Sequence, residues 1–257
     1  MKSKTNYITL NKALSLESGS VLNNVQIAYQ TYGTLNSSAD NVIFVCHALS
    51  GDAHLAFESD EEAGKLGWWD EMVGPGKGID TNKFFVICSN TIGSCLGSTG
   101  PQSINPATNK PYGLSFPIIT IKDMVQAQKL LCDQLGVNQL HSVVGASMGG
   151  MQALQWSIDY PAFVKQCTLV ATASKLSPQS MAFAAVGRHS IKSDSNWQQG
   201  SYSADKLPEI GLGIARMIGH ITYLSEESIT RKFGRKLQEK SDYEYSFDTE
   251  FQIESYL

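Results

Sequence analysis

Short apolar runs alternate with polar turns through the first two thirds of the chain. Residues 7–10 and 25–32 are rich in β-branched and aromatic side chains, which predicts two strands that pair antiparallel at the start of a sheet. Residues 41–46 and 84–88 are almost entirely apolar, as in strands that are covered on both faces. Residues 164–171 predict a further buried strand.

Between these runs, apolar residues recur at helical spacing. Residues 123–135 predict an amphipathic helix that begins at Asp123 and stops at Gly136. Strands and helices alternate over residues 40–172, which predicts a mainly parallel sheet with right-handed crossovers. The apolar stripe of the helix is expected to consist of Met124, Ala127, Leu130, Leu131 and Leu135.

The pattern changes after residue 173. Residues 181–186 predict a helix of small side chains, and residues 210–224 predict another helix despite three glycines. Each interior glycine costs a helix about 1 kcal/mol relative to alanine, so close packing or a binding site is expected to compensate. We therefore divide the chain into a core of residues 1–174 and a helical segment of residues 175–257.

The junction at residues 140–159 carries the clearest chemical signal. A strand that ends in Val143-Val144 meets Gly-Ala-Ser-Met-Gly, and a helical pattern follows. This order predicts a nucleophile elbow, with Ser147 held in a strained turn beside the N–H groups of a helix N-terminus. An ordinary turn of small residues is the alternative. The helical pattern consists of Met151, Leu154, Gln155 and Ile158, which recur at helical spacing.

Composition narrows the classes of protein. The 257 residues are 42% apolar and 17% charged, as in a globular protein, and the net charge of −4 gives no electrostatic reason to expect nucleic acid or an anionic membrane as partner. No apolar run approaches the ~20 residues that span a bilayer. The first residues, MKSKTNYITL, lack the apolar core of a signal peptide, which predicts a cytoplasmic protein. The five cysteines lack C-x-x-C spacing, which predicts reduced thiols.

Two further features allow more than one interpretation. His47 and His54 flank a short loop and suit either metal binding or, as we favour, loop shaping through hydrogen bonds, since no further ligand spacing accompanies them. Residues 90–117 are rich in glycine but lack a Walker lysine, which favours a structured loop over the strand ends rather than a phosphate loop.

A stripe of functional side chains is predicted in the second helix of the C-terminal segment. Arg216, Gly219, His220 and Tyr223 follow i, i+3, i+4, i+7 spacing, which places them on one face. A cation, an imidazole and a phenol together suit an anionic ligand. A structural salt bridge is the alternative that spacing leaves open.

The chain resembles the homoserine O-acyltransferases in five segments: HALSGDAH (47–54), GWWDEMVGPGKGIDT (67–81), SNTIGSCLGSTGPQSINPATNKPYG (89–113), VVGASMGGMQALQW (143–156) and ARMIGHITYLS (215–225). These segments are spread over nearly the whole chain, and the GSTGPQSINP block separates the family from general esterases. The resemblance implies an α/β-hydrolase fold with a mostly parallel sheet, crossover helices and a helical cap. It also implies an enzyme of methionine biosynthesis that moves an acyl group from acyl-CoA to the hydroxyl of L-homoserine.

Matched position by position, the resemblance implies a role for several residues. Ser147 would be the acyl-accepting nucleophile, and the backbone amides of Leu49 and Met148 would form the oxyanion hole. Arg216 would hold the homoserine carboxylate, which suits a guanidinium fork, with Tyr223 beside it. The resemblance implies no bound cofactor and no metal, with acyl-CoA as co-substrate, and a homodimer through the cap when the protein is full length.

The last segment departs from the family's pattern. Residues 225–257 are charged and aromatic without a predicted strand, and no late Gly-His-Asp context carries a catalytic histidine. The family places its catalytic Asp and His after the cap, whereas His189 and His220 lie in cap-like segments and are not expected to act as the base. We therefore expect a C-terminally truncated fragment that lacks the final core strands and has no turnover of its own.

Two other functions stay open. One is a serine esterase on the same scaffold, and the other is a non-catalytic remnant. The sequence does not decide between homoserine and serine as acceptor, or between acetyl and succinyl as the transferred group, although acetyl is favoured.

Overall fold

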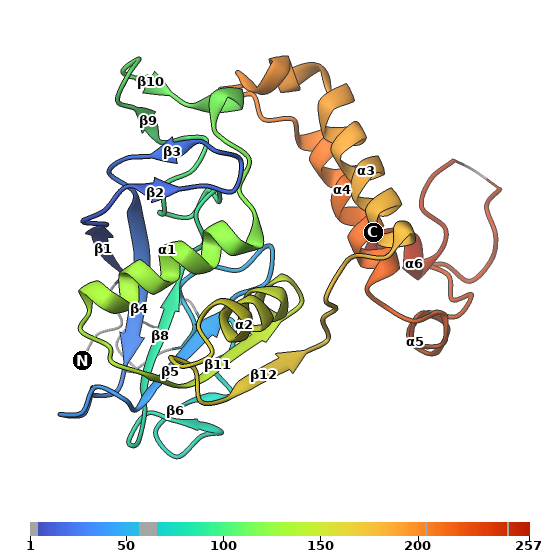
Figure 1. Ribbon diagram of the computed structural model, residues 1–257. Helices are drawn as coiled ribbons and strands as arrows, with labels where there is room; N and C mark the ends of the chain where they lie inside the picture. The colour runs from blue at the N-terminus through green and yellow to red at the C-terminus, as the bar shows by residue number, and fades with distance from the viewer. Residues whose placement is uncertain (1–4, 57–65, 204, 246) are drawn as a thin grey trace. The chain divides into compact units, whose positions relative to one another are not determined.

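The computed structural model of this protein describes residues 5–56, 66–203, 205–245 and 247–257 (Figure 1). The chain divides into two compact units, Met1–Lys175 and Leu176–Leu257, which we term the core unit and the helical unit. Their boundary adjoins the one expected from the sequence after residue 174.

A six-stranded sheet lies at the centre of the core unit. Its strands are β1 (Asn6–Thr9), β4 (Gln26–Tyr32), β5 (Val42–Cys46), β8 (Phe85–Ser89), β11 (Leu140–Ala146) and β12 (Cys167–Val170), in the spatial order β1-β4-β8-β5-β11-β12. The first pairings, β1 with β4 and β4 with β8, are antiparallel, and the other three pairings are parallel. The expected antiparallel start and mainly parallel remainder are both confirmed.

Three short strand pairs form separate two-stranded sheets outside this sheet. They are β2 (Leu14–Ser15) with β3 (Val21–Leu22), β6 (Val73–Gly74) with β7 (Ile79–Asp80), and β9 (Ile104–Asn105) with β10 (Lys110–Pro111). A short 3-10 helix, η1 (Gly113–Ser115), follows the last of them.

β5 is buried along its whole length, as its apolar sequence predicts. Successive side chains of a strand point to opposite faces of the sheet. Phe44 therefore packs on one face, against Trp156 with ring centroids 5.8 Å apart. Helices α1 (Ile121–Gln134) and α2 (Met148–Asp159) cover this face of the sheet (Figure 1). Val45 packs on the other face, in a second cluster that includes Val73.

α1 begins two residues before the predicted start, at Ile121. Thr120 is the N-cap: its side-chain oxygen accepts from the Asp123 N–H at 3.2 Å, and Asp123 Oδ2 accepts from the Thr120 N–H at 2.9 Å. Asp123 is thus the third helical residue of a capping box rather than the first residue of the helix. The predicted stripe is only partly right. Met124, Leu130 and Leu135 are half-buried, and Val125, Gln128 and Cys132 take buried positions instead.

The helix predicted after Ser147 is present as α2, but the residues that recur at helical spacing do not form its buried face. Ile158 is 60% exposed, and Met151, Leu154 and Gln155 are half-buried. The buried face is instead formed by Gly149, Gly150, Gln152, Ala153 and Trp156. Two glutamines explain the difference, because Gln128 Nε2 of α1 donates to Gln152 Oε1 at 2.6 Å and Gln128 Oε1 accepts from the Trp156 indole at 2.8 Å. These hydrogen bonds satisfy the buried polar groups, which an apolar pattern alone would place on the exposed face of the helix.

β12 also departs from its predicted environment. The prediction of a buried strand at residues 164–171 is wrong, since the strand is shorter and all four of its residues are exposed, Leu169 by 42% and Val170 by 41%. Among the described strands, β12 is the last in the order of the sheet and pairs only with β11, so its side chains keep access to solvent.

The helical unit consists of α3 (Pro178–Ser193), the 3-10 segment η2 (Ser195–Gly200), α4 (Glu209–Thr222), α5 (Glu226–Lys232) and α6 (Gln252–Tyr256). α3 and α4 pack side by side (Figure 1). A Cβ at Gly211 would lie 2.4 Å from the Ser190 carbonyl oxygen, so close packing does compensate for that glycine. α5 was not predicted, although Ser225 caps it by accepting from the Ser228 N–H at 3.1 Å.

In the described ranges, no helix has both the length and the apolar character that crossing a membrane requires.

Candidate active site

Ser147 lies between β11 and α2, where the parallel strands end. Its backbone has φ 54° and ψ −122°, a conformation that costs a residue with a side chain about 1–3 kcal/mol. The residue is exposed, and among the described residues none hydrogen-bonds to its hydroxyl. The strained turn that the G-x-S-x-G pattern predicts is therefore present, while the role of Ser147 as a nucleophile stays a prediction.

Glycines let the neighbouring backbones approach this turn. A Cβ at Gly145 would lie 2.0 Å from the Gly149 carbonyl oxygen, and one at Gly149 would lie 2.1 Å from the Cys46 carbonyl oxygen. Real Cβ atoms essentially never come within 3.0 Å of a heavy atom outside their own residue and its chain neighbours. Both glycines are thus required for α2 to start directly against β11 and β5.

The two backbone amides expected in the oxyanion hole are available as donors. Met148 is the first residue of α2, where the helix leaves N–H groups without intrahelical acceptors and favours negative charge. Leu49 lies in the loop after β5, and β5 pairs with β11 so that Cys46 lies opposite Gly145. Within the described part of the chain, neither the Met148 N–H nor the Leu49 N–H has an acceptor. Whether the two N–H groups converge on one oxyanion stays a prediction.

His47 shapes the loop that carries Leu49. The ring is 1% exposed, Nδ1 lies 2.7 Å from the Ala48 carbonyl oxygen, and Nε2 accepts from the Thr91 N–H at 3.1 Å. The Nδ1 atom therefore bears the proton. Burial lowers the pKa of His47, which keeps the imidazole neutral. These contacts support the hydrogen-bonding role that we favoured over metal binding.

His54 has a similar role on the same loop. Its Nδ1 lies 3.2 Å from Gln30 Oε1, and the backbone N–H of His54 donates to Asp52 Oδ1 at 2.8 Å. Among the described residues, no cluster of three or more His, Cys, Asp or Glu side chains is placed to hold a metal ion.

The long loop after β8 is held in place by Asn90, which the sequence analysis did not single out. Asn90 Oδ1 accepts from the Ser94 hydroxyl at 2.6 Å and from the Ser98 N–H at 3.2 Å, and its carbonyl accepts from the Ser98 hydroxyl at 2.6 Å. Its amide nitrogen lies 3.4 Å from His47 Nε2. The expected structured loop is confirmed, and it begins at the carboxyl end of β8 beside the His47 loop.

Arg216 and Tyr223 lie on α4 or at its C-terminal end, in the helical unit, and both are exposed, Tyr223 by 81%. The Tyr223 ring lies over Gly219, where a Cβ would meet ring carbon Cε2 at 3.4 Å, so this part of the predicted stripe is observed. His220 packs instead against Tyr256, with ring centroids 5.0 Å apart. No described residue hydrogen-bonds to its buried Nδ1.

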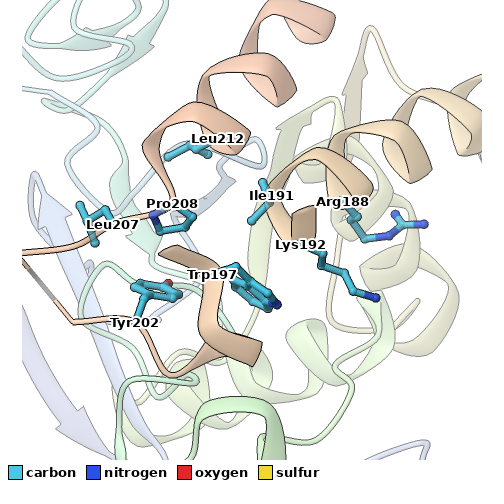
Figure 2. Close-up of a pocket in the computed structure, with 8 residues that line it drawn as sticks. All are labelled: Arg188, Ile191, Lys192, Trp197, Tyr202, Leu207, Pro208 and Leu212. Carbon is cyan, nitrogen blue, oxygen red and sulfur yellow. The ribbon is translucent and has the colours of Figure 1, made fainter. Parts of the chain in front are cut away.

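The helical unit also contains a cavity of about 440 Å³ that the sequence did not indicate. Figure 2 shows its walls, with Arg188 and Lys192 extending from α3 and their charged ends directed away from Leu207 and Pro208. Trp197 and Tyr202, with ring centroids 5.7 Å apart, are aromatic side chains within a polar stretch. The other lining residues are Ile191 and Leu212.

Comparisons with known proteins agree with this geometry. The profile of the α/β hydrolase fold matches residues 41–249. The homoserine O-acetyltransferase of Methanohalobium evestigatum is 56% identical over 256 residues, which cover 99% of this chain and 52% of the relative. The Mesorhizobium japonicum protein of the same name is 54% identical over 247 residues, 96% of this chain and 63% of the relative. The chain thus spans about half to two thirds of the length of these curated relatives.

Solved structures point to the same fold with two activities. The homoserine O-acetyltransferase from Bacillus anthracis is 32% identical, with a TM-score of 0.90 over 100% of this chain and 69% of the other. Esterase E22 is 33% identical, with a TM-score of 0.86 over 100% of this chain and 71% of the other. The chain therefore belongs to the α/β hydrolase fold family, and within it is a relative of the homoserine O-acetyltransferases.

Proposed function

We propose that the protein of which this chain forms part transfers an acetyl group from acetyl-CoA to the hydroxyl of L-homoserine, through an acyl-Ser147 intermediate, in methionine biosynthesis. The observation that carries the proposal is the strained, exposed Ser147 at the head of α2, beside a Met148 N–H without an acceptor among the described residues. The names of the relatives support acetyl rather than succinyl as the transferred group.

In the first half-reaction, Ser147 Oγ attacks the thioester carbonyl carbon and its proton passes to a base. The N–H groups of Leu49 and Met148 donate to the tetrahedral oxyanion, which is the step at which such donors contribute most. The carbon–sulfur bond then breaks, and the thiol of coenzyme A leaves with the proton from the base.

In the second half-reaction, the homoserine hydroxyl gives its proton to the base and its oxygen attacks the acyl carbon. The bond to Ser147 Oγ breaks, and Ser147 regains a proton. Arg216 holds the homoserine carboxylate, with Tyr223 beside it, because a guanidinium offers two parallel donors to a carboxylate. Transfer exceeds hydrolysis when the amino acid excludes water from the site.

The base is not among the described contacts of Ser147. His47 is unsuited because both of its ring nitrogens are already used in the loop. We assign the base to a histidine in the part of the longer relatives that this chain does not span, with acyl-CoA as co-substrate and no resident cofactor.

Association of two copies through the helical unit is part of the proposal. Several apolar side chains of α3 and α4 are exposed, among them Val186 by 52%, Ile210 by 77% and Ile221 by 49%. Exposed apolar side chains on neighbouring helices suit an interface between subunits. The cytoplasmic location expected from the sequence likewise stays a prediction.

Ester hydrolysis is a second candidate, since esterase E22 shares the fold at 33% identity. The identity of 56% to a homoserine O-acetyltransferase favours the transferase. The two functions differ in one measurable respect, because release of coenzyme A depends on homoserine only in the transferase.

The test uses a chimera in which this chain is continued by the C-terminal part of the Mesorhizobium japonicum relative. We expect acetyl-CoA to acylate Ser147, seen by mass spectrometry of the intact protein, and release of coenzyme A to require homoserine. Ser147→Ala should abolish the acyl-enzyme with its fold intact, whereas Ser157→Ala, within α2, should retain it. Release that is independent of homoserine would support the hydrolase, and acylation of the Ser147→Ala variant would refute the assignment.

Residues 1–257 alone are the control for the chimera. Without a base, a serine hydroxyl is a weak nucleophile, so we expect no measurable turnover from residues 1–257 alone. Turnover by the chain itself would place the base within it and make His189 and His220 the first candidates. If the chimera also folds but is never acylated, the non-catalytic alternative is favoured.

A further inference from the structure

Residues 170–172, which include the end of β12, hold the backbone of Ser147 on both sides. The Ser147 N–H donates to the Val170 carbonyl at 3.1 Å. The Thr172 hydroxyl donates to the Ser147 carbonyl at 2.7 Å. One short segment thus engages both backbone polar groups of the residue at which the chain turns.

Two local features allow this double contact. Ala171 has φ 44°, in the left-handed region that residues with a side chain disfavour, so the chain bends sharply between Val170 and Thr172. Gly150 leaves the space that Thr172 fills, because a Cβ there would lie 2.6 Å from Thr172 Cβ. Ser147 and Ala171 thus both have a positive φ, and the hydrogen bond from Ser147 to Val170 joins their two turns. Such strain persists where the surrounding structure over-determines it, and it clusters at active sites.

The contact from Thr172 constrains the direction of the Met148 N–H. The peptide between Ser147 and Met148 is planar and trans, so its C=O and N–H point in opposite directions. A hydroxyl that fixes the Ser147 carbonyl therefore also fixes the Met148 N–H. Donation to the carbonyl further polarises the peptide, which strengthens its N–H as a donor.

Thr172 differs from the other donors to this carbonyl. The N–H groups of Gly150 and Met151 also donate to the Ser147 carbonyl, at 3.0 and 3.2 Å, but both belong to α2 and move with it. Thr172 follows β12 and so ties the peptide to the sheet from outside the helix.

We propose that Thr172 is a positioning residue for acyl transfer, whose hydroxyl holds the Ser147–Met148 peptide so that the Met148 N–H meets the oxyanion. The catalytic part of this proposal rests on the proposed function, in which Ser147 is acylated.

The kinetic test compares Thr172→Val with Thr172→Ser in the chimera. Valine keeps the shape of the side chain and removes the hydroxyl, whereas serine keeps the hydroxyl. We expect Thr172→Val to slow acylation of Ser147 by acetyl-CoA roughly tenfold, the effect of one hydrogen bond on a transition state. Thr172→Ser should restore most of the rate.

A spectroscopic test is independent of turnover. The sequence contains two Ser-Met pairs, Ser147-Met148 and Ser180-Met181, so protein labelled with carbonyl-¹³C serine and ¹⁵N methionine gives two correlations between a carbonyl and the next N–H. In Thr172→Val, the carbonyl resonance of Ser147 should move upfield, as expected when a carbonyl loses a hydrogen bond. That of Ser180, in α3, should stay in place.

The outcomes separate the two proposals. An unchanged acylation rate in Thr172→Val overturns the positioning role while leaving Ser147 as the nucleophile. A slow Thr172→Ser variant shows that shape rather than the hydroxyl matters, and also overturns it. If the unsubstituted chimera is not acylated at Ser147, the proposed function fails, and the catalytic role of Thr172 fails with it even where the carbonyl shift is observed.

Discussion

Gly149→Ala tests whether the close approach of α2 to β5 sets the geometry of the elbow. A Cβ at position 149 would lie 2.1 Å from the carbonyl oxygen of Cys46 and 2.9 Å from that of His47. Both are backbone atoms, so no side chain can rotate away to make room. The start of α2 must therefore move relative to the end of β5 and to the loop that carries Leu49.

The size of the movement follows from the contact distances. Ordinary van der Waals contact begins at 3.4 Å, so the Cβ and the Cys46 oxygen must separate by about 1.3 Å. Overpacking of this kind costs about 1–3 kcal/mol of folding free energy. A displacement of ~1 Å within a catalytic site reduces the rate about a hundredfold, and Met148, one of the two proposed oxyanion donors, adjoins the displaced residue.

Urea unfolding would measure the stability of Gly149→Ala, and the rate of Ser147 acylation in the chimera would measure its effect on catalysis. Gly213→Ala is the matched control, because among the described residues no atom outside the adjoining helix backbone lies within 4 Å of a Cβ at that position. Alanine there should stabilise α4 by up to ~1 kcal/mol and leave acylation unchanged. If Gly149→Ala kept both stability and acylation rate, the close approach would not be what holds the elbow in place.

Three further predictions concern other parts of the chain. Gly211→Ala should destabilise the packing of α3 on α4 by about 1–3 kcal/mol, because its Cβ would lie 2.4 Å from a backbone oxygen. Equal unfolding midpoints for Gly211→Ala and the control Gly213→Ala would contradict this. Arg216→Ala should raise the homoserine KM roughly ten- to hundredfold with little effect on acylation of Ser147, whereas equal loss in both half-reactions would indicate a structural arginine. Burial lowers the pKa of His47 from its usual 6.5, so its neutral form stabilises the fold fully above pH 6.5 and this contribution is lost as the pH falls. His47→Gln should therefore weaken the dependence of unfolding free energy on pH below about 6.5, and an unchanged dependence in urea unfolding at a series of pH values would contradict this.

The local sequence determined most of the elements of the core unit. Uninterrupted apolar residues predicted the burial of β5, because a strand with side chains packed on both faces needs no polar alternation. Gly145 and Gly149 around Ser147 predicted the sharp turn, because a tight approach of backbones excludes any side chain at those positions. These features are encoded over a few residues, so a pattern of neighbours is enough to find them.

The tertiary structure alone decided which positions near the elbow are buried and what they contact. Gln152 is buried in α2 because Gln128, 24 residues earlier, hydrogen-bonds to it, and a hydrophobic pattern cannot include a partner from another helix. β12 is apolar in sequence yet exposed, because burial depends on what lies beside a strand in the sheet rather than on its own residues. In the sequence, nothing distinguishes Thr172 from an ordinary loop residue. Only the fold brings its hydroxyl to the Ser147 carbonyl, 25 residues away along the chain. Periodicity reports the conformation of a segment, whereas hydrogen bonds between distant segments depend on how the sheet and its helices pack.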